Sequence, residues 1–259
     1  MIPAVLAPPP GASPVRLLCF HHAGGGASAF TSWAHALGPH WELFAVRLPG
    51  RESRLLEPRV TRHEQLLAEL DAGLGPLPHT PYVLYGHSLG ALVAYAFAQH
   101  RSRLGHPPLA VLVGACPPPH AEPPPLTADA DDRRLLAALG RLGGMPAEVL
   151  GRAGILRRAL DLIRDDLRLA QNLRAVPHEP LAVPLYAFAG DRDPMADHAT
   201  MRGWSHCTTG PFDCHDVPGG HFFHSDPDFL VLLRTHLARL PTGLSRAFPE
   251  PSTDHREAP

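Results

Sequence analysis

The sequence predicts an α/β fold in which helices cover both faces of a mainly parallel sheet. Two observations support this prediction. Short apolar runs with strand character alternate with segments whose apolar residues recur at helical spacing. One strand-like run also passes through Gly-His-Ser-Leu-Gly, residues 86–90, directly into a helical run. The length of 259 residues suits one large domain with a substantial core.

Each expected strand ends at a recognisable break in the sequence. The first ends at the glycine-rich residues 21–26, the second at Pro49 and Gly50, and the fourth at three consecutive prolines from Pro117. The fifth closes in a turn, Gly-Asp-Arg-Asp-Pro, at 190–194. The expected strands are 15–20, 41–48, 82–85, 109–116, 184–189 and 212–217.

The helices are predicted from the spacing of apolar side chains, as in Leu66, Leu67, Leu70 and Leu74. Ser28 is the expected cap of a helix that continues to residue 37. The other expected helices are 64–74, 89–100, 133–142, 153–173, 195–205 and 227–240.

A block with only helical periodicity, from Thr127 to about Val176, lies between two expected strands. Such a block indicates a helical lid inserted into the domain, at about 120–180. The expected organisation is therefore a Pro-rich N-terminal extension at 1–14, a domain at 15–240 and a disordered tail at 241–259.

The composition argues against several classes of partner. A formal net charge of −2 disfavours nucleic acid or an anionic membrane as the main partner. No apolar run approaches the length of a membrane span, and the first 14 residues lack the basic start of a signal peptide. The four cysteines form no evident disulfide framework. We therefore expect a protein of the reducing cytoplasm.

The Gly-His-Ser-Leu-Gly segment is typical of a nucleophile elbow, because a strand precedes it and a helix follows. Side chains at Gly86 and Gly90 would collide with backbone in such a tight turn. The turn would hold the Ser88 hydroxyl at the carboxyl edge of the sheet, beside the positive end of the helix. Ser88 is therefore the candidate nucleophile.

A serine nucleophile needs a base, and the base needs an orienting acid, which follow in the order Ser, Asp or Glu, His in this architecture. His221 is the preferred base, since it lies in a loop after the last strand, with His224 as its rival. Asp193 is the preferred acid, and Asp191 is expected instead to hold the turn by bonding backbone N–H groups.

An oxyanion hole requires two N–H donors. The backbone N–H of Leu89, directly after the nucleophile, is one candidate. The second is the N–H of Ala23, in a glycine-rich loop that follows the first expected strand.

Several segments together resemble the type II thioesterases of polyketide and nonribosomal peptide assembly lines, from about residue 15 to 240. The segments that carry the resemblance are Phe-His-His-Ala-Gly-Gly at 20–25, Leu-Pro-Gly-Arg-Glu at 48–52, the elbow, Gly-Asp-Arg-Asp-Pro at 190–194 and Gly-Gly-His-Phe-Phe at 219–223. A lid stretch beginning Arg164-Asp165-Asp166 also resembles a family motif.

This resemblance implies an α/β-hydrolase fold with a helical lid, and hydrolysis of acyl or aminoacyl thioesters on the phosphopantetheine arm of carrier proteins. It implies a Ser88–Asp193–His221 triad and an oxyanion hole at Ala23 and Leu89. Acyl or peptidyl carrier domains are the expected partners, no cofactor is expected, and the expected state is a monomer. Leu156 and Leu160 of the lid are expected to line the acyl channel.

The sequence leaves three alternatives open: a free-standing esterase acting on oxygen esters, an acyltransferase, and a catalytically silent binding protein of the same fold. A metal site at Cys207, Cys214, His215 and Asp216 is disfavoured, because zinc-binding cysteines usually lie closer together in the sequence.

Overall fold

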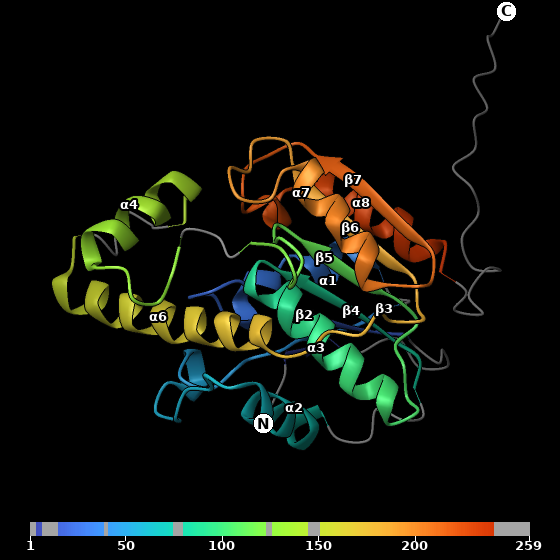
Figure 1. Cartoon of the computed structure of the whole chain (residues 1–259), viewed down its shortest axis with the longest axis horizontal. Coiled ribbons are helices and arrows are strands. Elements are labelled where there is room, and N and C mark those ends of the chain that lie inside the picture. The colour runs from blue at the N-terminus through green and yellow to red at the C-terminus, as the bar shows by residue number, and fades with distance from the viewer. Residues whose placement is uncertain are drawn as a thin grey trace, which may run out of the picture.

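The computed structural model describes residues 4–6, 15–38, 41–74, 80–122, 126–144 and 151–240. The expected extension and tail lie almost wholly outside these ranges, and their boundaries stay predictions. A seven-stranded sheet runs through the centre of the molecule in the order β1-β3-β2-β4-β5-β6-β7 (Figure 1). All neighbouring pairs from β3 to β7 are parallel, and β1 is antiparallel to β3. The strands are β1 Ala4–Leu6, β2 Val15–Phe20, β3 Trp41–Ala45, β4 Tyr82–His87, β5 Val111–Gly114, β6 Leu185–Gly190 and β7 Phe212–Val217.

Helices cover the sheet on both faces, as the sequence predicts (Figure 1). Side chains from α1 and α8 share one apolar cluster with the sheet, whereas α2, α3, the end of α6 and α7 contribute to the cluster on the other face. The helices are α1 Trp33–Leu37, α2 His63–Leu74, α3 Leu89–Arg103, α4 Asp132–Leu142, α6 Ala153–Ala175, α7 His198–Arg202 and α8 Pro227–Ala238.

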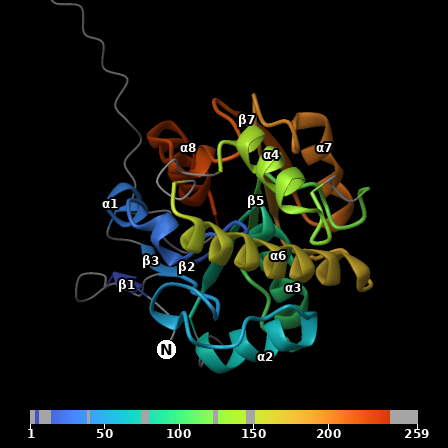
Figure 2. The same ribbon diagram turned by 90° about the vertical axis from the view of Figure 1, so that its left-hand side faces the viewer.

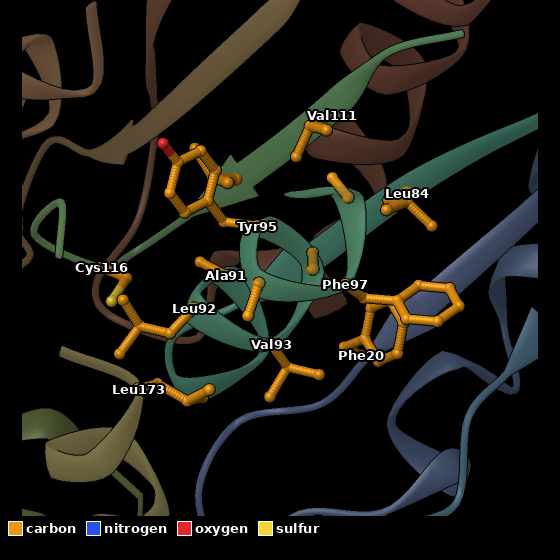
Figure 3. Close-up of a cluster of buried hydrophobic side chains, with 14 of the residues drawn as sticks. Phe20, Leu84, Ala91, Leu92, Val93, Tyr95, Phe97, Val111, Cys116 and Leu173 are labelled. Atoms are coloured by element: carbon orange, nitrogen blue, oxygen red, sulfur yellow. The ribbon is translucent and has the colours of Figure 1, made fainter. Parts of the chain in front are cut away.

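Helix α3 follows the central strand β4 and is almost entirely buried. Its side chains pack among Phe20 of β2, Leu84 of β4, Val111 of β5 and Leu173 of α6 (Figure 3). Ala, Gly and Val positions let the helix lie close to the sheet, while Phe97 fills the space near Phe20 at a ring-centroid distance of 6.3 Å. The tight packing fixes the start of α3, which is also the end of the elbow.

Helices α4 and α6 form the expected lid, and Figure 2 shows them crossing in front of the strands. They pack on each other through a small apolar cluster of their own that includes Leu135, Leu139, Leu160 and Ile163. Asp131 caps α4 by accepting a hydrogen bond from the Arg134 N–H, and Gly143 ends it in the left-handed conformation with φ of 75°. The carboxyl half of α6 packs on the main core through Leu169 and Leu173.

The structure differs from the sequence prediction at element ends. Ser28 caps no helix, because it lies inside a short 3-10 helix, Ala27–Phe30, that precedes α1. The expected helix at 195–205 is a short α7 followed by the 3-10 helix Gly203–Cys207. Strand β1 was not predicted, since three residues are too few for a periodic pattern.

Candidate active site

Ser88 lies in a strained turn between β4 and α3. Its φ of 55° and ψ of −120° are rarely adopted by a residue with a side chain. The two flanking glycines make the turn possible. A Cβ on Gly86 would lie 2.0 Å from the carbonyl oxygen of Gly90, and one on Gly90 would lie 2.0 Å from that of Phe20. The predicted elbow is therefore present, with the glycines required for the steric reason inferred from sequence.

The predicted acid and base converge on Ser88 from the ends of β6 and β7. The Nε2 atom of His221 lies 3.0 Å from Ser88 Oγ, and its Nδ1 lies 2.9 Å from Asp193 Oδ2. Because a carboxylate can only accept, Nδ1 carries the proton, which leaves Nε2 free to accept the Ser88 hydroxyl proton. His221 and Asp193 are 3% and 5% exposed, so water competes little for these bonds.

The remaining oxygen of Asp193 accepts a hydrogen bond from the Met195 N–H at 2.9 Å, which fixes the carboxylate plane. Asp191 has the other role inferred for it. Its Oδ1 accepts the N–H of Gly219 at 2.8 Å, and so holds the loop that carries His221. The rival base, His224, does not reach the site; its ring packs on His87 with centroids 4.1 Å apart.

His87 supports the site from beneath, and sequence reasoning missed this role. Its Nε2 donates to the carbonyl oxygen of His221 at 2.6 Å, while Nδ1 accepts from the Tyr85 hydroxyl at 2.9 Å. Burial, followed by the proximity of His224 and His221, lowers the pKa of His87 well below its usual value. His87 is therefore neutral and anchors the backbone of His221. In the sequence, the position of His87 between Gly86 and Ser88 of the elbow was the only indication of this role.

The two candidate oxyanion donors border the same cavity as Ser88. Leu89 is the first residue of α3 and borders the cavity, so the positive end of the helix dipole lies beside it. Ala23 lies in the turn after β2, where the Gly25 N–H bonds to the His22 carbonyl at 3.0 Å.

The cavity extends from the triad beneath the lid and is mostly apolar. Its lining includes Leu92, Leu139, Ile163, Leu167 and Ala170, together with Ser88, His221, Ala23 and Leu89. Its lining also includes two polar side chains, Gln171 and Arg174. An apolar chamber beside a nucleophile suits an acyl chain.

Leu156 and Leu160, the two lid residues predicted to line the channel, do not border this cavity. Leu160 is 3% exposed inside the α4–α6 cluster, and Leu156 packs against that cluster. The face of α6 toward the cavity carries Ile163, Leu167 and Ala170 instead. Helix α6 carries apolar residues both on the side toward α4 and on the side toward the cavity. The periodicity of its sequence therefore does not indicate which of these residues line the cavity.

Within the described residues, no group of three or more His, Cys, Asp or Glu is placed to hold a metal ion, and no helix is long and apolar enough to cross a membrane. The four cysteines are free thiols. Burial raises the pKa of the Cys207 thiol to about 12 and that of Cys214 to about 11, so neither is a ready thiolate ligand.

Comparison with known proteins agrees with this geometry. A family model described as a thioesterase domain matches residues 15–237. Thioesterase PikA5 of Streptomyces venezuelae is 36% identical over 216 residues, which cover 83% of this chain and 77% of that protein. Among solved structures, the RedJ thioesterase from the prodiginine biosynthetic pathway in Streptomyces coelicolor is 34% identical with a TM-score of 0.80, covering 91% of this chain and 95% of that one. The type II thioesterase BorB from the borrelidin biosynthetic cluster is also 34% identical, with a TM-score of 0.76 over 90% of this chain and 95% of its own.

Proposed function

Because the chain belongs to the thioesterase family, we propose that it removes acyl or aminoacyl groups from the phosphopantetheine arm of carrier domains. The observation that carries this proposal is the hydrogen-bonded series Ser88–His221–Asp193, whose serine and histidine line an apolar chamber. The series supplies an activated nucleophile, and the chamber supplies space for an acyl chain. RedJ comes from the prodiginine biosynthetic pathway and BorB from the borrelidin biosynthetic cluster, and together with the resemblance found in the sequence they direct the proposal toward polyketide or nonribosomal peptide biosynthesis.

In the proposed mechanism, His221 Nε2 takes the proton of Ser88 as Oγ attacks the thioester carbonyl carbon. The carbonyl oxygen becomes an oxyanion, which the N–H groups of Ala23 and Leu89 stabilise. The tetrahedral intermediate collapses, the C–S bond breaks, and the pantetheine thiol leaves with a proton from His221. Water then attacks the acyl-Ser88 ester, with His221 again as the base, and releases the carboxylic acid.

Asp193 keeps the His221 proton on Nδ1 in this mechanism and stabilises the imidazolium that forms during attack. Neutral His87 complements this role, because its hydrogen bond to the His221 carbonyl holds the backbone without adding positive charge beside the imidazolium. No bound cofactor is needed for any of these steps.

We further infer an editing or release role in the cytoplasm, acting on carrier-bound groups as a monomer. The experiment that tests the function compares one acyl group on three leaving groups: a carrier protein, free pantetheine and p-nitrophenol. The proposal expects the highest kcat/KM for the carrier-bound thioester. A higher kcat/KM for the p-nitrophenyl ester than for both thioesters would instead indicate an esterase. Adding a free amine or alcohol acceptor and measuring acyl transfer against free acid separates hydrolysis from transacylation.

A further inference from the structure

A buried ion pair joins the lid to the loop after β3, and both of its side chains contact the neighbouring loop that carries the Ala23 donor. Arg51 follows β3 in the Pro-Gly-Arg-Glu segment, and Asp166 lies on α6 of the lid. The side chains are 4% and 1% exposed. Arg51 binds both carboxylate oxygens of Asp166, with Nη2 2.7 Å from Oδ1 and Nη1 2.9 Å from Oδ2. This bidentate pairing fixes the relative orientation of the two groups.

The same two side chains also bind the backbone directly after Ala23. Asp166 Oδ2 accepts a hydrogen bond from the Gly24 N–H at 2.8 Å, and Arg51 Nη1 donates to the Gly25 carbonyl oxygen at 3.0 Å. The Gly24 N–H belongs to the peptide group that joins Ala23 to Gly24, so its direction restricts the conformation of Ala23 itself. Gly24 has φ of 75° and lies so close to α6 that a Cβ there would be 2.7 Å from Ile163 Cγ1.

A purely structural link at this junction would not need a buried charge pair. Burying two charges costs solvation energy that their attraction only partly offsets, so apolar residues of similar size are often as stabilising. The protein also contains a second ion pair between the same loop and the same helix, Arg59–Asp165 at 2.9 Å. Its side chains are 26% and 24% exposed, and among the described residues neither side chain forms a hydrogen bond with residues 22–26. The Arg51–Asp166 pair differs from it because its two side chains form hydrogen bonds with the peptide groups beside the oxyanion donor.

We propose that Arg51 and Asp166 are positioning residues that hold the Ala23 N–H in its catalytic orientation and make that orientation depend on the seating of the lid helix. The proposal rests on the function assigned to Ala23 above. Ile163 and Leu167, which flank Asp166 by three and one positions, border the acyl cavity. An acyl chain that packs on these residues therefore contacts α6, the helix whose Asp166 orients the Ala23 donor.

The test replaces each pair with apolar residues: Arg51→Met with Asp166→Leu, and as the matched control Arg59→Met with Asp165→Leu. For the first double variant, kcat on an acetyl-pantetheine thioester should fall about ten- to a hundredfold, approaching the loss of one oxyanion donor. Its KM should change little, and the control should keep the kcat of the unaltered protein. Full kcat in the folded first variant would overturn the proposal.

A second readout separates mispositioning from partial misfolding. A phenylboronic acid forms a tetrahedral adduct on a catalytic serine, and one of its oxygens occupies the oxyanion hole. A misfolded fraction lowers the apparent kcat but leaves the inhibition constant unchanged, whereas a displaced donor raises that constant in proportion to the loss of kcat/KM. If the double variant fails to fold, Asp166→Asn gives the same readout, because one side of its amide is a donor that meets the donors of Arg51 and so breaks the bidentate pairing that orients Gly24 and Gly25. An unchanged inhibition constant in folded Asp166→Asn would contradict the proposal. All variants are compared with the unaltered protein, whose own failure to cleave thioesters would count against the proposed function instead.

Discussion

At the residue scale, the site depends on the different partners of two neighbouring carboxylates. Asp193 bonds to the ring of His221, whereas Asp191 bonds to the backbone of Gly219 in the same loop. Both lie after β6, and sequence position alone could only rank them. The fold decides between them, because the loop after β7 brings the ring of His221 to Asp193 and the backbone of Gly219 to Asp191.

Asp193→Asn should therefore lower kcat by about a thousandfold or more, because an amide at this position favours the wrong tautomer of His221. Thermal stability should change little, as the substitution is isosteric. Asp191→Asn is the matched control: its kcat should stay within a few-fold of the unaltered protein. Steady-state hydrolysis of an acyl-pantetheine thioester measures both, and a larger loss in Asp191→Asn would reverse the assignment.

The elbow glycines make a second prediction at this scale. Gly90→Ala should destabilise or unfold the protein, since its Cβ would lie 2.0 Å from the rigid backbone of Phe20. Gly140→Ala in α4 has open space around it and should raise stability by about 0.5–1 kcal/mol, the usual preference for Ala in a helix. Urea unfolding of both variants tests the pair. An equally stable Gly90→Ala protein is the result that this steric account does not allow.

At the element scale, the lid shows where sequence reasoning stopped. The apolar spacing and the Gly143 break predicted both helices to within a few residues, because spacing reports on amphipathic faces. The choice between the face of α6 toward α4 and the face toward the cavity depends on packing between distant segments. Leu160 lies on the face toward α4, and Ala170 lies on the face toward the cavity.

Ala170→Phe should consequently shorten the acyl cavity and reduce hydrolysis of octanoyl-pantetheine far more than that of acetyl-pantetheine. A bulky side chain at Ala170 enters the cavity, whereas Ala153→Phe, exposed at the start of the same helix, does not. The ratio of kcat/KM for the two thioesters is the measurement. Equal losses on both substrates in folded Ala170→Phe would show that this part of the lid does not set chain length.

At the scale of the whole molecule, several buried histidines outside the triad are neutral, and three of them, His22, His87 and His224, pack on one another. Burial lowers the pKa of His21 and of His224 to about 4, and lowers those of His22 and His87 well below their usual value. In the unfolded chain these groups titrate near 6.5. The unfolded state therefore binds more protons in acid, and stability should fall as the pH drops from about 6.5 toward 4.

Replacing His224 with Phe removes one of these groups, so the free energy of unfolding should depend less steeply on pH across that interval. The ring of His224 packs on His87 and Phe222, which an aromatic substitute can also do. Urea unfolding at several pH values measures the slope, and His35→Phe at an exposed helix position is the control. An unchanged slope in His224→Phe would mean that this histidine is not buried neutral.

Much of this architecture was predictable from the chain. The alternation of strands and helices, the elbow glycines and the order Ser88, Asp193, His221 are local or ordinal signals, and they suffice for the fold and for the residues that the structure brings together. The supporting contacts were not predictable. His87 beneath His221 and Asp166 against Gly24 join segments far apart in the sequence, and no periodicity reports such contacts.

The central claim is that Ser88 accepts the acyl group from a thioester, and intact-mass spectrometry during turnover tests it most directly. Mixing the protein with a short-chain acyl-pantetheine and quenching in acid within seconds should reveal a fraction of protein heavier by one acyl group, located by peptide mapping to Ser88. Ser88→Ala should fold normally, show no such adduct and release thiol no faster than buffer. Thiol release by folded Ser88→Ala at the rate of the unaltered protein, or an acyl group on another residue, would contradict the account.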